Sequence, residues 1–433
     1  MSHRPPARRL LPSLALLALA GCAEQRAPEA PHAATPAPAL ALRAEPWPLP
    51  TADASAAQPD LIATADGRLL LSWIEGHGTT RHTLRLAAFD GSRWDAPRTI
   101  ASGGDWFVNW ADTPHIEATA DGALWAHWLQ KSAAGTYAYD VALTRSADGG
   151  RSWARPVTVN TDGTPTEHGF VALWPAARDR VGIAWLDGRH TGGGHDGHHG
   201  GGAMTLRTAS FDAALARHDE RELDASTCDC CQTDAAITAR GPLLVYRDRA
   251  DGEIRDIYAA RLDPDGWTPA RAVHADGWVM PACPVNGPAV DAAGTQAVVG
   301  WYTAAGGTPA VKLAHSADAG ARFGAAHVLD QGEAVQGRVD VALDADAAWA
   351  LWLREAPTGQ SLWLARFTPD LRRELQRVEL ARPQGKGRGT GFAKLALRNG
   401  VPHVVWTELH AGAPRLRAAV VRTLPAQGSV AVR

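Results

Sequence analysis

Residues 69–73 read Leu-Leu-Leu-Ser-Trp, and a short hydrophobic run that ends in an aromatic residue recurs along the whole chain. Successive runs end 51 to 61 residues apart, at Trp73, Trp128, Trp185, Tyr246, Trp301, Trp352 and Trp406. A repeat of this length is typical of propellers and solenoids. We therefore interpret the 433-residue chain as one repeat-built domain, although length alone would suggest about three domains.

The second repeat shows how each unit is built. Its segments 115–120, 123–129, 139–146 and 153–159 are short and apolar, and turn residues such as Asp121-Gly122 separate them. Four short strands with no amphipathic helix between them are typical of one propeller blade. The sequence predicts an all-β propeller of seven four-stranded blades, with six blades as the alternative, and excludes a helical solenoid.

A turn before the fourth strand carries a family resemblance. Residues 146–153, Ser-Ala-Asp-Gly-Gly-Arg-Ser-Trp, match the Asp-box pattern S-x-D-x-G-x-[ST]-W, and residues 316–323 match it less closely. The chain therefore resembles the Asp-box (BNR repeat) propellers of the sialidase superfamily over nearly all of its mature length. Because the box oxygens accept backbone N–H bonds within the turn, we assign Asp148 and Asp318 a structural role.

The last repeat offers only three strands of its own. Residues 44–49, Ala-Glu-Pro-Trp-Pro-Leu, repeat the fourth-strand pattern of residues 94–100. Pairing of the two chain ends would close the ring and cover exposed strand edges. We expect the segment around Trp47 to form the outer strand of the final blade, beside residues 417–421.

The first 22 residues have the order of a lipoprotein signal. Three arginines among the first nine residues precede an apolar run at 10–19, and Leu-Ala-Gly-Cys at 19–22 matches a bacterial lipobox. The apolar run is too short to span a bilayer as a helix. Resemblance to bacterial lipoproteins implies that Cys22 is lipidated, and Ala23 favours the outer membrane.

These features divide the chain into three parts. We expect a signal peptide at 1–21, an Ala/Pro-rich tether at 22–43 and a single propeller domain at 44–433. The protein would then be anchored in the cell envelope by lipid at Cys22, with periplasmic or surface display left open. The formal net charge of −3 argues against nucleic-acid binding, and we expect a monomer.

Unusual polar residues collect in the segments that join blades and in the loops between second and third strands. In a propeller both surround the mouth of the central channel, where binding sites form. Arginines there can clamp a carboxylate or phosphate, although alternating Arg and Asp is equally typical of a salt-bridge lattice. The candidate ligand-binding residues are Arg189, Arg247, Asp248, Arg249, Arg255, Asp256, Asn286, Arg338 and Asp340.

Apart from Cys22 the chain has four cysteines, which enter two neighbouring blades at equivalent positions: Cys228, Cys230, Cys231 and Cys283. We expect them to meet in space. The triplet's sulfurs are poorly placed to pair with one another, so a disulfide would join Cys283 to the triplet. The alternative is a soft-metal site for Cu or Zn, because thiolates select such ions. A Gly-rich loop supplies further possible metal ligands at His190, His195, His198 and His199.

Three function classes remain open. The first is an envelope lipoprotein whose channel mouth binds a small-molecule, glycan or metal ligand. The second is a sialidase-type glycoside hydrolase, if the chain is an enzyme. The family's arginine triad and Tyr/Glu nucleophile are not reproduced, since Tyr246 occupies a core position. The third is an envelope interaction scaffold stabilised by disulfides. We favour the first, with Cu or Zn as the candidate cofactor.

Overall fold

The computed structural model describes residues 40–51, 55–77, 80–192 and 201–425. These residues form seven antiparallel sheets, each a blade of four strands, so the predicted seven-bladed propeller is confirmed. Helical structure in the described ranges is limited to two short turns, η1 (Ala305–Gly307) and η2 (Gly387–Thr390). Within those ranges we find no helix with the length and apolarity needed to cross a membrane.

The blades follow one another in chain order. The first three consist of β2 (Ala56–Ala63), β3 (Leu69–His77), β4 (Arg81–Phe89), β5 (Arg98–Gly103); β6 (Ile116–Ala118), β7 (Leu124–Lys131), β8 (Tyr139–Ser146), β9 (Val157–Thr158); and β10 (His168–Ala177), β11 (Arg180–Asp187), β12 (Thr205–Phe211), β13 (Arg217–Asp224). The fourth, whose outer strand is split in two, consists of β14 (Asp234–Thr238), β15 (Gly241–Arg247), β16 (Ile257–Asp263), β17 (Gly266–Trp267) and β18 (Arg271–Ala272).

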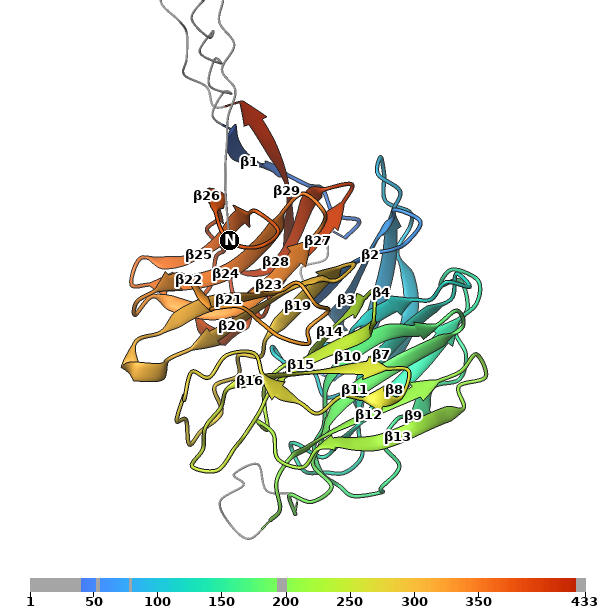
Figure 1. The fold of residues 1–433 in the computed structure, drawn as a ribbon. Helices are drawn as coiled ribbons and strands as arrows, with labels where there is room; N and C mark the ends of the chain where they lie inside the picture. The colour runs from blue at the N-terminus through green and yellow to red at the C-terminus, as the bar shows by residue number, and fades with distance from the viewer. Residues whose placement is uncertain (1–39, 52–54, 78–79, 193–200, 426–433) are drawn as a thin grey trace, which may run out of the picture. The chain divides into compact units, whose positions relative to one another are not determined.

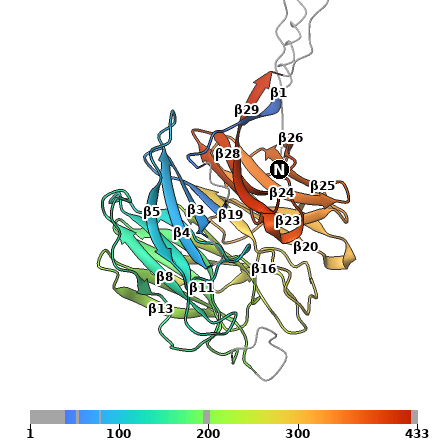
Figure 2. The same ribbon diagram turned by 180° about the vertical axis from the view of Figure 1, so that it is seen from behind.

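The remaining blades complete the ring. They consist of β19 (Ala289–Ala293), β20 (Gln296–Thr303), β21 (Ala310–Ser316), β22 (His327–Gln331); β23 (Val335–Leu343), β24 (Ala348–Ala356), β25 (Gly359–Phe367), β26 (Glu374–Ala381); and β27 (Lys394–Arg398), β28 (Val401–His410), β29 (Ala413–Pro425) with β1 (Leu40–Pro46). Each first strand contacts the first strand of the next blade, and β27 contacts β2 (Figures 1 and 2). The ring is therefore closed.

The N-terminal strand joins the last blade as expected. In Figure 1 the blue strand β1 lies beside the red strand β29, with Ala44 opposite Val421 and Pro46 opposite Ala419. This prediction is confirmed. The strand begins at Leu40, four residues before the expected domain boundary, because Leu42 and Ala44 pack against the core between blades 6 and 7.

The repeated aromatic residues form the core between blades. Trp73, Trp185, Trp301 and Trp352 have no solvent exposure. Each packs with apolar residues of the preceding blade, and Trp73 packs with those of blade 7. Burial of such large side chains is strongly favourable. The repeat that identifies the fold in the sequence is therefore also what holds neighbouring blades together.

The Asp-box turn has the hydrogen bonds expected of a turn motif. The Ser146 hydroxyl accepts the Gly150 N–H at 2.8 Å, and Asp148 Oδ1 accepts the N–H groups of Arg151 and Ser152 at 3.0 and 2.9 Å. Ser316 and Asp318 repeat this arrangement in blade 5. All of these oxygens serve the backbone of the turn, which agrees with a structural role.

Buried or partly buried aspartates link consecutive blades around the central channel. Asp60, Asp234, Asp291 and Asp340 each accept a backbone N–H from the first strand of the next blade, at 2.7–2.9 Å. The cavity that they line has a volume of about 490 Å³. Lys394 stands at the corresponding strand of blade 7, with its Nζ 4.0 Å from Asp60 Oδ1. It supplies positive charge inside an acidic ring.

Candidate metal centre

Three cysteines lie in the segment that leads from β13 into β14. Its backbone is held on both sides: the Thr227 N–H donates to the Met204 carbonyl at 2.8 Å, and the Cys228 N–H donates to the Arg247 carbonyl at 3.0 Å. Cys228, Cys230 and Cys231 are consequently buried, with at most 4% exposure. Gln232, the next residue, lines the channel cavity, so this segment lies beside the channel.

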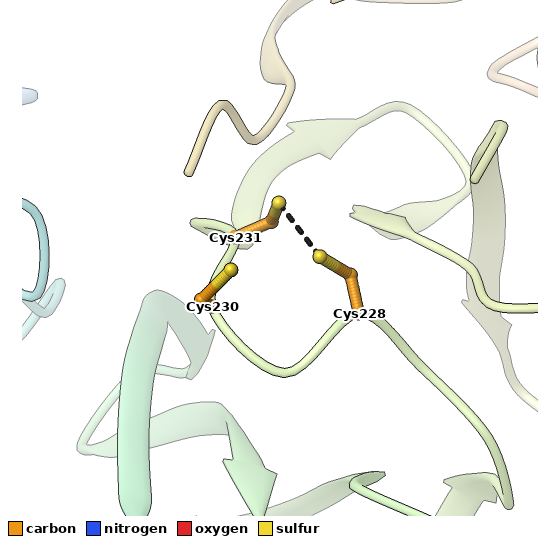
Figure 3. Close-up of side chains that lie close together, drawn as sticks. All are labelled: Cys228, Cys230 and Cys231. Carbon is orange, nitrogen blue, oxygen red and sulfur yellow. Dashed lines mark hydrogen bonds between the residues drawn. The ribbon is translucent and has the colours of Figure 1, made fainter. Parts of the chain in front are cut away.

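The three sulfurs converge, as Figure 3 shows. Their Sγ atoms lie within 4.8 Å of one another, and the Cys228 thiol donates to Cys231 Sγ at 2.8 Å. Cys283 precedes β19, is partly buried and packs against the cluster of buried side chains that contains the three cysteines. The structure thus brings all four cysteines together as free thiols.

The closest sulfur pair differs from the one expected. We expected Cys283 to be the best partner for the triplet, but the shortest distance joins Cys228 and Cys231. The two intervening residues let the chain turn, so the flanking side chains point toward each other (Figure 3). The spacing in the sequence disfavours only the adjacent pair and the pair one residue apart, whereas the Cys-x-x-Cys spacing of Cys228 and Cys231 permits this contact.

The thiols have different electrostatic surroundings. Burial raises the pKa of the Cys228 thiol to about 12 and that of Cys230 well above its usual value. Burial also opposes ionisation of Cys231, but its sulfur accepts hydrogen bonds from both thiols and from the Asn286 N–H. Together with the charge of Arg247, these bonds hold the pKa of Cys231 well below its usual range. Cys231 is therefore the thiol best prepared to become a thiolate.

Arg255 has unused hydrogen-bonding capacity beside these sulfurs. It is 2% exposed, and its Nη2 donates to Glu253 at 2.6 Å. Its Nε and Nη1 are buried and have no hydrogen-bond partner. Its charge acts on the nearby Cys228 and Asp229. Two unpaired donors next to a thiol cluster are suited to an anionic partner.

The other arginines expected at a ligand clamp are occupied by the protein itself. Arg247 donates to the carbonyls of Asn286 at 2.7 Å and Tyr302 at 2.7 Å, and lies over the Trp278 ring. Arg338 donates to Thr390 at 3.0 Å and to two carbonyls of the same segment. These guanidinium groups brace loops from neighbouring blades, because their donors are already used.

The remaining candidates have structural partners as well. Both oxygens of Asp340 accept backbone N–H groups, those of Asp256 accept two from residues 277 and 278, and Asn286 Oδ1 accepts the Arg338 N–H. Arg249 pairs with Glu253. Burial and the charge of Asp224 raise the pKa of Asp248 to about 7. His190 is exposed, while His195, His198, His199 and Cys22 lie outside the described residues.

A second group of potential metal ligands is better explained by hydrogen bonds. His168 Nε2 lies 3.1 Å from Asp162 Oδ2 and 3.7 Å from Asp187 Oδ1. However, the Asp187 carboxylate already accepts four hydrogen bonds, three from Arg189 and one from Trp185. No lone pair is left for a metal ion, so this group is an ion-paired network that holds Arg189 in place.

A tyrosine and two carboxylates meet elsewhere in the fold, but they are inaccessible. The Tyr139 hydroxyl lies 2.6 Å from Glu167 Oε1 and 3.1 Å from Asp112 Oδ2. Tyr139 has no solvent exposure, and burial raises the pKa of Asp112 to about 8. A nucleophile at this place would not reach a substrate.

Of the four channel aspartates, only Asp340 is among the candidate residues selected from the sequence. The signal was present, because Asp60, Asp234, Asp291 and Asp340 occupy similar positions in the first strands of their repeats. Trp278, which stacks on Arg247, was also overlooked. It lies outside the repeated aromatic runs, so no periodicity identifies it.

Comparison with known proteins gives a likeness of fold. No protein-family model matches the chain, and no curated protein matches its sequence. The polysaccharide lyase Uly1 matches with a TM-score of 0.50 at 8% identity, over 84% of this chain and 89% of that chain. A protein of unknown function from Dyadobacter fermentans DSM 18053 has a TM-score of 0.48 at 13% identity, over 86% and 95%.

The NanB sialidase from Streptococcus pneumoniae has a TM-score of 0.42 at 11% identity, over 88% of this chain and 70% of that chain. At identities this low, the substrates of these enzymes cannot be transferred to this chain. The likeness is one of fold, and at that level the chain is a seven-bladed β-propeller.

Proposed function

We propose that the protein is a cell-envelope lipoprotein whose propeller binds one soft metal ion through Cys228, Cys230 and Cys231. The observation that carries this proposal is the convergence of three buried sulfurs beside Arg255, whose Nε and Nη1 have no hydrogen-bond partner. Buried charged donors without partners are rare in folded proteins and call for an explanation. A negatively charged metal–thiolate group would supply the partner.

The donor set favours a soft ion of low coordination number. Thiolates select Cu(I) and Zn(II), and structural Zn(II) normally takes four ligands. Three sulfurs converge here, which suits Cu(I) best, whereas Zn(II) would also need Cys283. Three thiolates with one monovalent ion carry two negative charges. Arg247 and Arg255, whose charges act on Cys231 and Cys228, would offset them.

Localisation in the envelope is the second part of the proposal. It rests on the basic, apolar and lipobox segments that precede Cys22 in the order of a lipoprotein signal. Lipid at Cys22 would tether the propeller to a membrane through the Ala/Pro-rich segment. Free thiols in an exported compartment require protection from oxidation. Burial of the cysteine triplet, together with a bound metal ion, would provide it.

Metal titration tests the proposal. Full-length protein would be purified anaerobically in detergent, reduced, and titrated with Cu(I) against bathocuproine disulfonate, and separately with Zn(II) against a chromophoric chelator. We expect about one Cu(I) per chain, with affinity that weakens as pH falls because each thiol must lose its proton. Cys231→Ser should abolish tight binding, while Ser226→Ala, in the same segment, should not.

Two outcomes would contradict the proposal. The first is fully reduced wild-type protein that retains neither Cu(I) nor Zn(II). The second is natively isolated protein in which mass spectrometry finds all four mature cysteines oxidised, with no metal uptake after gentle reduction. That result would favour the disulfide-stabilised scaffold. Thiol counting with and without reductant, done on the same preparation, distinguishes the two.

A further inference from the structure

Cys283 differs from the other three cysteines in its access to solvent. It is partly buried, while the triplet is at most 4% exposed. The two residues before it, Pro281 and Ala282, are exposed, and Val279 is 61% exposed. Cys283 therefore lies between an exposed stretch of chain and the buried sulfurs. Of the four described cysteines, Cys283 is thus the one most accessible to solvent.

On its inner side Cys283 is connected to the triplet through one member. Cys283 packs against the same cluster of buried side chains as the triplet, and Cys230 is the member whose pKa the Cys283 thiol raises. Cys283 lies outside the group of three sulfurs that are all within 4.8 Å of one another. Its sulfur is thus within contact distance of the cluster without being part of it, a position suited to a temporary ligand.

The backbone next to Cys283 is held in a costly conformation. Val285 has a φ of 49°, which is unfavourable for a β-branched residue. The adjacent Asn286 fixes it: its N–H donates to Cys231 Sγ, and its carbonyl accepts Arg247 Nε and Nη2 at 3.0 and 2.7 Å. Strain of this kind persists where the surroundings enforce it and clusters at functional sites. The strained residue lies two positions after Cys283.

We propose that Cys283 is the transfer ligand, through which Cu(I) passes between an external thiol-bound Cu(I) complex and the buried Cys228–Cys230–Cys231 site. This inference rests on the soft-metal function proposed above. In this proposal Cys283 determines how fast Cu(I) exchanges, and the three buried cysteines determine how tightly it is bound.

The exchange is a series of ligand substitutions without electron transfer. The Cys283 thiol loses its proton as its sulfur bonds to Cu(I), and one thiolate of the donor complex leaves and takes up a proton. Cys230 then loses its proton as it bonds to Cu(I), and Cys283 leaves and is protonated again. Copper stays monovalent throughout, so the route needs no oxidant or reductant. Exchange through neighbouring thiols follows access and thiolate character.

Transfer kinetics test this assignment. The full-length protein in detergent would be mixed anaerobically with the Cu(I)–glutathione complex in a stopped-flow instrument, and removal would be measured with bathocuproine disulfonate. We expect Cys283→Ser to slow transfer at least about tenfold in both directions, while affinity falls no more than about threefold. Cys230→Ser should lose affinity itself. Ala282→Ser, on the exposed stretch, is the matched control and should exchange at the wild-type rate.

Each outcome decides a different question. Wild-type exchange rates in Cys283→Ser would overturn the transfer role. A loss of affinity of about a hundredfold or more would also overturn it, by making Cys283 a permanent ligand. Wild-type protein that binds no Cu(I) would instead refute the soft-metal function itself. Cys283→Ala, with near-ultraviolet circular dichroism of each variant, separates these results from misfolding.

Discussion

Replacing Arg247 with methionine tests whether buried arginines hold the loops of the candidate metal centre. Methionine has a similar length but donates no hydrogen bond. Arg247 is 2% exposed, donates to the carbonyls of Asn286, Arg255 and Tyr302, and has its guanidinium carbon 4.9 Å from the Trp278 ring centre. The change therefore leaves three carbonyl acceptors without their charged donor.

The expected loss follows from these contacts. A hydrogen bond from a charged donor contributes about 1.5–3 kcal/mol, and an unpaired buried polar group costs about 1–3 kcal/mol. Contributions within one network are not additive, and methionine regains some apolar burial, so we expect the free energy of unfolding to fall by about 4 kcal/mol. For a domain of this size that corresponds to a fall in Tm of about 5 °C.

Urea unfolding followed by tryptophan fluorescence measures the effect. Arg249→Met is the matched control, because Arg249 forms a partly buried pair with Glu253 at 2.7 Å instead of bracing backbone carbonyls, and its loss should cost about 1–2 kcal/mol. A loss below about 1.5 kcal/mol for Arg247→Met, or equal losses for both variants, would refute the bracing argument. Thiol reagents should also reach Cys231 faster in Arg247→Met, since Asn286 loses its anchor.

Three further predictions concern the anchor, the channel and catalysis. Cys22→Ser should release the protein from the membrane fraction, and membrane retention with no lipid mass on the mature N-terminus would contradict lipidation. Burial raises the pKa values of Asp291 and Asp340 to about 7 and of Glu117 to about 8. Folded protein therefore binds these protons more tightly than unfolded protein, so their contribution to the free energy of unfolding should fall as the pH rises from about 4, near the ordinary pKa of these groups, to about 8. Asp291→Asn should weaken that dependence in urea titrations, and an unchanged slope would count against it. Neuraminidase activity on ordinary sialosides should be absent or very weak, and substantial turnover that disappears in an Arg338 variant would overturn this.

Much of the fold is readable from local sequence. The aromatic-ended runs mark the second strand of every blade, because a strand that is buried on both faces must be apolar along its length. The Asp-box at residues 146–153 marks a turn whose oxygens and N–H groups are close in the chain. Even the ring-closing strand is predictable, since residues 44–49 repeat the fourth-strand pattern.

The candidate site is only partly readable in this way. The sequence places Cys228, Cys230, Cys231 and Cys283 at the entrances of neighbouring blades, and this is enough to predict that they meet. It does not indicate which sulfurs are closest, because the distance between Cys228 and Cys231 depends on how the segment turns. The sequence also does not show whether an arginine binds a ligand or donates its hydrogen bonds to neighbouring loops.

What the sequence by itself determined is the repeat: the blades, their order, the turns and the closing strand, all of which follow from patterns within a few residues. Only the tertiary structure decided the use of the polar groups. Arg247 meets Tyr302, 55 residues away, and Arg338 meets Thr390, 52 residues away. Arginines look alike in the sequence, and the loop in which each one is buried determines which partners it contacts. The same burial left Arg255 with unpaired donors beside the thiols.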